Sequence, residues 1–69
     1  MQKRSLTIAG HKTSIALEPE FWTALEQIAD DTDMSLIDLI IQIDDNRVSN
    51  NLSSSLRVAC LKFFKTKKY

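Results

Sequence analysis

The chain has one histidine, His11, and one cysteine, Cys60, and the two are far apart in the sequence. This pair cannot supply the four ligands of a structural zinc site, and the single cysteine cannot form a disulfide within the chain. The sequence also has no Gly-rich phosphate loop and no motif that places two carboxylates together. We therefore expect a protein that is not an enzyme, with no catalytic residue, no metal and no cofactor.

The charged residues are strongly segregated although the formal net charge is zero. Residues 1–17 carry bases and no acid, residues 18–45 carry all nine acids and no base, and residues 47–69 carry only bases. If the fold brings the two basic ends to one face, that face can bind nucleic acid. The alternative is that the basic ends simply attract the acidic middle or a partner subunit. The charges alone do not decide between the two.

The individual residues with special chemistry also have plain structural interpretations. His11 follows Gly10, so a turn position is the first expectation, with a DNA contact as the alternative. Cys60 falls on an apolar helical row and is expected to be a small packed hydrophobe. Trp22 is expected in the core or in a dimer contact rather than as a stacking platform. The C-terminal lysines are either a solvated end or phosphate contacts.

A strand is predicted over about residues 12–17, because apolar and polar side chains alternate there. Ile15 and Leu17 share one face, and Lys12, Ser14 and Ala16 share the other. The stretch from Arg4 to Ala9 either lengthens this strand or forms an arm, with a bend at Gly10. No second convincing strand follows, so the hydrogen-bonding partner is expected to come from another copy of the chain.

Three helices are predicted after the strand. Pro19 begins the first, at about 19–31, because proline suits the first helical turn and an apolar stripe follows. Ser35 and Asp38 resemble a capping box for the second, at about 35–46. Its apolar residues cover more of the surface than one neighbouring helix can bury, which favours self-association. The third helix, at about 53–65, begins near Asn51 or Ser53 as cap.

The length of 69 residues allows one domain, residues 1–69. A monomer of this size buries only about 60% of the surface of its unfolded chain, and no disulfide or metal compensates, so oligomerisation is expected. No apolar run approaches the roughly 20 residues that cross a bilayer, and no secretory signal is visible. We expect a cytoplasmic homodimer that is mainly α with one β-strand per chain.

The sequence from Thr13 to Trp22, with Leu25, Ile28-Ala29 and Met34-Ser35-Leu36, resembles a ribbon-helix-helix DNA-binding domain. The run from Arg4 to Ser14 and the segment Asn51–Arg57 are similar to short bacterial members of that family. The resemblance extends over roughly residues 4–61. It implies an intertwined homodimer with an intermolecular two-stranded antiparallel sheet, plus an extra C-terminal helix.

The resemblance also implies a set of DNA-contacting residues. In this family three alternating side chains of the ribbon read bases in the major groove, and by position these are Lys12, Ser14 and Ala16. The start of the second helix holds a phosphate. The remaining expected contacts are to the DNA backbone, from Ser35, Leu36 and Ile37 at that helix start and from Lys3 and Arg4 as an arm.

Two functions follow as hypotheses. The first is sequence-specific DNA binding by a homodimer, in the manner of a bacterial transcriptional regulator with its ribbon in the major groove. The second is a protein-interaction, antitoxin-like module with the same dimer fold, in which the acidic middle and the third helix dock a partner protein. The expected partners are therefore DNA, a second copy of the chain and, for the second hypothesis, another protein, with no membrane.

Overall fold

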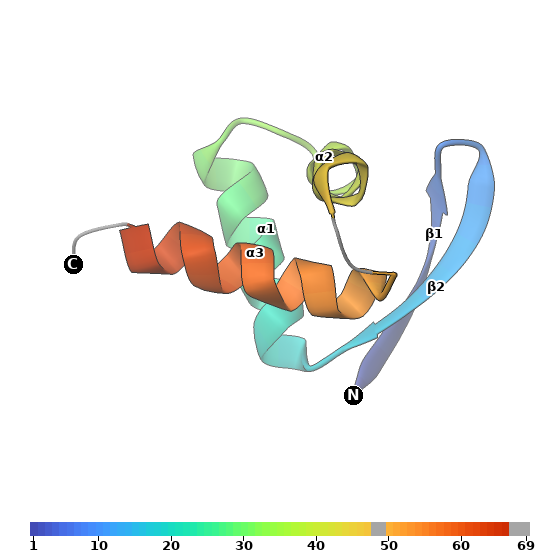
Figure 1. Cartoon of the computed structure of the whole chain (residues 1–69), viewed down its shortest axis with the longest axis horizontal. Coiled ribbons are helices and arrows are strands. Elements are labelled where there is room, and N and C mark those ends of the chain that lie inside the picture. Colours follow the sequence, from blue (N-terminus) through green and yellow to red (C-terminus); the bar gives the residue numbers. More distant parts are fainter. Residues whose placement is uncertain (48–49, 67–69) are drawn as a thin grey trace.

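The computed structural model describes residues 1–47 and 50–66. In chain order its elements are β1 (Gln2–Ile8), β2 (His11–Leu17), α1 (Pro19–Asp31), α2 (Leu36–Asn46) and α3 (Leu52–Thr66). Figure 1 shows the β-hairpin at one end of the long axis and the last turns of α3 at the other. None of the helices in these two ranges combines the length and the hydropathy needed to cross a bilayer.

The chain forms its own two-stranded antiparallel sheet. β1 pairs with β2 from Ile8 opposite His11 to Gln2 opposite Leu17. The two loop residues, Ala9 and Gly10, have φ values of 52° and 81°, which is the left-handed conformation that both central residues of a type I′ hairpin turn adopt. The prediction of a single strand per chain is therefore wrong, and residues 2–8 are a second strand rather than an arm.

The missed strand has a physical explanation. Leu6 and Ile8 alternate with Ser5 and Thr7, so the period-2 pattern was present in the sequence. Its turn was hidden because an alanine at positive φ is uncommon, whereas Asn-Gly or Asp-Gly marks this type of hairpin. One edge of β2 is consequently satisfied within the chain, so a second copy is not needed to hydrogen-bond that edge.

The inner face of the hairpin and the three helices enclose one apolar core. Trp22, Leu17, Leu25, Ile40 and Leu56 are its largest fully buried side chains. The expectation that Trp22 and Cys60 belong to the core is confirmed, with exposures of 0% and 2%. Burial raises the pKa of the Cys60 thiol to about 11, so the thiol stays protonated and unreactive near neutral pH.

Trp22 also connects β1 to α1. Its indole Nε1 donates a hydrogen bond to the backbone carbonyl of Gln2 at 2.8 Å. The guanidinium of Arg4 lies 4.6 Å from the ring centroid and 3.7 Å from a carboxylate oxygen of Glu26. These contacts hold the first strand against the first helix and leave Arg4 on the inner face of the hairpin.

Local capping sets the boundary between α1 and α2. Asp33 has a φ of 60°, and the next amide, that of Met34, donates to the carbonyl of Ala29 at 2.8 Å. This is the hydrogen-bond pattern that ends a helix with one left-handed residue. Ser35 then caps α2, because its hydroxyl oxygen accepts from the backbone N–H of Asp38 at 3.0 Å, and this part of the predicted capping box is confirmed.

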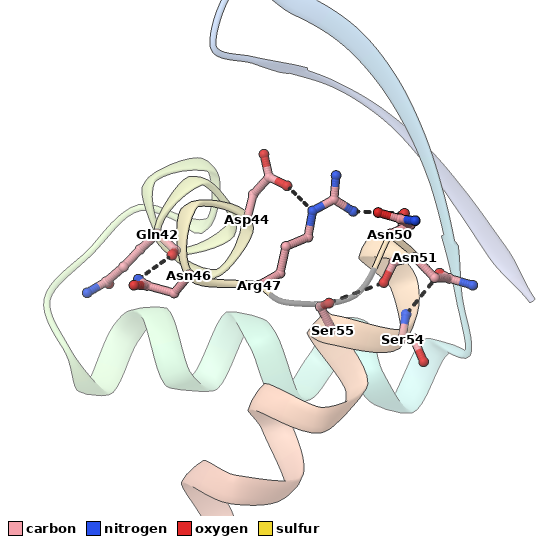
Figure 2. A network of polar contacts seen from close by, with 8 residues as sticks. All are labelled: Gln42, Asp44, Asn46, Arg47, Asn50, Asn51, Ser54 and Ser55. Atoms are coloured by element: carbon pink, nitrogen blue, oxygen red, sulfur yellow. Dashed lines mark hydrogen bonds and ion pairs between the residues drawn. The ribbon is translucent and has the colours of Figure 1, made fainter.

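Polar contacts define the connection between α2 and α3 (Figure 2). Arg47 lies 2.8 Å from a carboxylate oxygen of Asp44 and donates to the carbonyl of Asn50 at 3.1 Å. The side-chain oxygen of Asn51 accepts from the amide of Ser54 at 3.1 Å, so Asn51 caps α3. Arg47 therefore ties the end of α2 to the beginning of α3.

A third ion pair connects the residue before α1 to α3. The guanidinium of Arg57 donates to both carboxylate oxygens of Glu18, at 2.9 and 3.3 Å, and lies 5.8 Å from the ring centroid of Phe21. The hydrogen bonds from Arg57 hold the pKa of Glu18 below its usual 4.5.

We expect Glu18→Gln to lower the melting temperature slightly at neutral pH. A carboxylate whose pKa is lowered by folding stabilises the fold above its unfolded pKa, and this contribution disappears as the pH falls through the lower folded value. The difference in melting temperature between the two proteins should therefore shrink below about pH 4.5. In an Arg57→Gln background the pH-dependent part of this difference should become much smaller, because the hydrogen bonds from Arg57 are the largest cause of the lowered pKa of Glu18, and an unchanged difference there would contradict the assignment.

Candidate nucleic-acid interface

The outer face of the hairpin gathers polar side chains from both strands. Directly opposed residues of an antiparallel pair lie on the same face of the sheet. The register pairs Lys3 with Ala16, Ser5 with Ser14 and Thr7 with Lys12, and these six residues form the outer face. Five of them are exposed and Ala16 is half-buried.

A contact between two hydroxyl groups and two exposed lysines characterise this outer face. The hydroxyl oxygens of Ser5 and Ser14 lie 3.4 Å apart across the two strands. Within residues 1–47 and 50–66, the ion pairs join each of the three arginines to an acid and involve neither Lys3 nor Lys12. Because residues 1–17 contain no acid, the outer face is a positively charged surface.

The predicted DNA-contacting residues of the hairpin do not all lie on the same face of the sheet. Lys12, Ser14 and Ala16 lie together on the outer face, and Lys3 lies beside them on β1. Arg4 has the opposite orientation, because its guanidinium contacts Glu26 and Trp22 on the inner face. The structure therefore brings Lys3 to the predicted interface and does not bring Arg4 there.

The family model of the ribbon-helix-helix domain matches residues 1–64 of this chain. The chain belongs to the ribbon-helix-helix family. The predicted ribbon-helix-helix fold of the chain, with its additional C-terminal helix, is confirmed, and the number of strands per chain is corrected from one to two. The intertwined homodimer and its intermolecular sheet stay predictions.

A solved structure gives the same picture of the fold. This ribbon-helix-helix chain is 39% identical to an uncharacterized protein from Bordetella pertussis Tohama I, with a TM-score of 0.81. The similarity covers 93% of this chain and 55% of the Bordetella chain, so this chain spans little more than half of that protein's length. Comparison with curated proteins finds no match.

The second helix of the ribbon-helix-helix domain begins at the predicted phosphate-binding residues. The hydroxyl oxygen of Ser35 accepts from the amide of Asp38, and its O–H is left to donate to a ligand. The side chains of Leu36 and Ile37 are half-buried, which leaves their backbone amides as the groups able to meet a phosphate. α2 also contacts β1.

Two outer-face residues, Ser5 and Thr7, were missed by the sequence analysis. Their only signal was the alternation with Leu6 and Ile8, which is readable once residues 2–8 are taken as a strand. Cross-strand pairing then places them beside Ser14 and Lys12 without further assumption.

The lysines in the described part of α3 lie far from the hairpin. The last described turn of α3, which carries Lys62 and Lys65, lies at the opposite end of the long axis (Figure 1). Within one chain these two described lysines are therefore separated from the basic hairpin. The lysines expected as tail contacts, Lys67 and Lys68, lie outside the described residues.

A separate apolar surface lies on α3. Val58 and Leu61 are exposed to 47% and 66%. Val58 lines two open grooves, one of about 410 Å³ between α2 and α3 and one of about 370 Å³ between α1 and α3, and Leu61 lines the second of them. This surface is the part of the third helix that the protein-interaction hypothesis invokes.

Proposed function

We propose that this protein is a sequence-specific DNA-binding homodimer, acting as a bacterial transcriptional regulator in the cytoplasm. The observation that carries the proposal is the outer face of the hairpin, which is exposed, free of acids and carries two lysines that form no ion pair among the described residues. Membership in the ribbon-helix-helix family, a non-enzymatic DNA-binding fold, supports the same function.

The proposed dimer forms through the free edge of β2. A two-residue hairpin loop makes its flanking residues, Ile8 and His11, a hydrogen-bonded pair, and such pairs alternate along the ladder. The backbone N–H and C=O groups of Lys12, Ser14 and Ala16 consequently point away from β1. Pairing this edge with the same edge of a second copy, antiparallel, satisfies these groups and places both outer faces on one side.

Each proposed contact has a defined chemistry. Lys12 donates to guanine O6 or N7, Ser14 donates or accepts, and Ala16 contacts at most a thymine methyl group. At the start of α2, the Ser35 hydroxyl and the amides of Leu36 and Ile37 hold a phosphate, favoured by the positive end of the helix dipole.

Lys12→Ala tests the base-reading role. A DNA sequence is first selected from a random pool with the wild-type protein, and affinities for it and for an unrelated duplex are then measured by fluorescence anisotropy. We expect the variant to bind the selected duplex about tenfold or more weakly and to lose discrimination, because a good contact to a guanine edge provides roughly 1–3 kcal/mol of specificity.

Lys62→Ala is the matched control for this experiment. Lys62 is exposed and belongs to the second half of α3, which runs away from the hairpin (Figure 1), so its removal should leave discrimination between the two duplexes unchanged. If the Lys12 and Lys62 variants behave alike, Lys12 does not read bases.

The exposed apolar surface of α3 favours a second candidate function, a protein-interaction, antitoxin-like module. Val58 and Leu61 would contact an apolar segment of the partner protein, while the hairpin stays free. Such a complex should survive about 1 M salt, where charges are screened beyond roughly 3 Å and DNA is released. Affinity purification at that salt concentration tests this function. Wild-type protein should capture a partner protein, and the Leu61→Asp variant should lose it.

A further inference from the structure

We propose that β1 forms the two outer strands of a four-stranded sheet in the dimer and that Ser5 and Thr7, together with Lys3, contact the DNA phosphates on both sides of the groove. This proposal rests on the DNA-binding function proposed above. It gives a role to the second polar row of the outer face, which is formed by Lys3, Ser5 and Thr7. This row lies on β1, and β1 is not part of the two-stranded ribbon that was expected from the sequence.

The order of the strands follows from the hydrogen bonding. β1 occupies one edge of β2, and the described residues form a sheet of these two strands only. If the other edge of β2 pairs with its copy in the second chain, the order becomes β1, β2, β2 of the second chain, β1 of the second chain. Each DNA-reading strand is then flanked on its outer side by a strand with its own row of polar side chains.

The dimensions decide what each row reaches. Neighbouring strands lie about 4.8 Å apart, so the two copies of β2 lie about 2.4 Å, and the two copies of β1 about 7 Å, from the twofold axis. The major groove of B-DNA is about 12 Å wide, or about 6 Å on each side of that axis. The β2 side chains therefore enter the groove, whereas β1 lies above its phosphate walls.

The side chains of the β1 row can also donate to phosphate oxygens, and their distance from the twofold axis, rather than their chemistry, separates them from the base-reading row. Hydroxyl and ammonium groups are common donors to phosphate oxygens. Ser5 and Thr7 are exposed beside Ser14 and Lys12, and Lys3 is exposed and pairs across the strands with Ala16, whose side chain is short. The inner-face cation of the same strand, Arg4, is already bound by Glu26, so this strand offers its outward side chains alone to a ligand.

The double variant Ser5→Ala/Thr7→Val tests the proposal. Valine keeps the β-branched shape of threonine and removes only the hydroxyl group. We expect binding to weaken about tenfold, and equally on the selected and the unrelated duplex, because lost phosphate contacts carry no sequence information. The dependence of affinity on salt should be unchanged, since no charge is removed.

Lys3→Gln provides the charged counterpart. With two copies per dimer, it should reduce the slope of log K against log salt concentration by about two. Thr23→Val on α1 is the matched control for the hydroxyl variant, because Thr23 is exposed on a helix rather than on the hairpin. Circular dichroism and sedimentation should show every variant folded and dimeric.

The outcomes separate this inference from the proposed function. If wild-type protein binds neither duplex, the DNA-binding function is wrong, and the inference with it. If wild type binds and Lys12→Ala loses discrimination while Ser5→Ala/Thr7→Val behaves like Thr23→Val, only the role of β1 is overturned. A change of preferred sequence in the double variant would also overturn it, because β1 would then reach the bases.

Discussion

Trp22→Ala is expected to remove much of the stability of the folded chain. The indole is 0% exposed and lies among the largest buried side chains of the core. Truncating a buried aromatic residue to alanine costs about 3–5 kcal/mol. A folded chain of 69 residues has a stability of roughly 3–10 kcal/mol, so this loss removes much or all of it. Urea denaturation followed by circular dichroism measures the change.

Trp22→Phe separates the apolar from the polar contribution of this residue. Phenylalanine keeps most of the buried surface but cannot donate to the carbonyl of Gln2, and its ring is a poorer partner for Arg4. We expect a folded protein that is about 1–2 kcal/mol less stable and whose β1 amides exchange faster with solvent. An alanine variant as stable as the phenylalanine variant would contradict the central role of Trp22 in the core.

The second large effect is expected for Ser14→Pro. The backbone N–H of Ser14 points to the free edge of β2, and proline removes that donor while leaving the ladder with β1 intact. We expect a folded monomer at micromolar concentration in sedimentation equilibrium. Affinity for DNA should fall by at least about 100-fold, because two linked half-sites become two independent ones.

Ser5→Pro is the matched control, since Ser5 is paired with Ser14 and its N–H points to the opposite edge of the sheet. It should remain dimeric if the copies join through β2. A monomeric Ser5→Pro variant together with a dimeric Ser14→Pro variant would mean that the copies join through β1, and the assigned strand order would be wrong.

Much of the backbone can be predicted from short segments of the sequence. Pro19 with the apolar stripe that follows it indicates the first helix, and the hydroxyl of Ser35 indicates the start of the second. Both signals are local, because a proline in the first turn and a serine at the cap affect only backbone N–H groups within four residues. Alternation between residues 12 and 17 likewise assigned Lys12 and Ser14 to the face opposite Ile15, as the strand geometry requires.

The first strand and half of the candidate interface were decided only by the tertiary structure. Ala9 carries no strong turn signal, and the sequence pattern therefore did not reveal the hairpin. The segment before Ala9 is a strand because Ile8 is buried in the core and the indole of Trp22 donates to the carbonyl of Gln2, twenty residues away. Arg4 illustrates the same limit, because a basic residue near Lys3 looks available for DNA in the sequence. Its distant partner Glu26 neutralises it in the fold. Pairings between residues far apart depend on how the whole chain packs, and a local pattern carries no information about them.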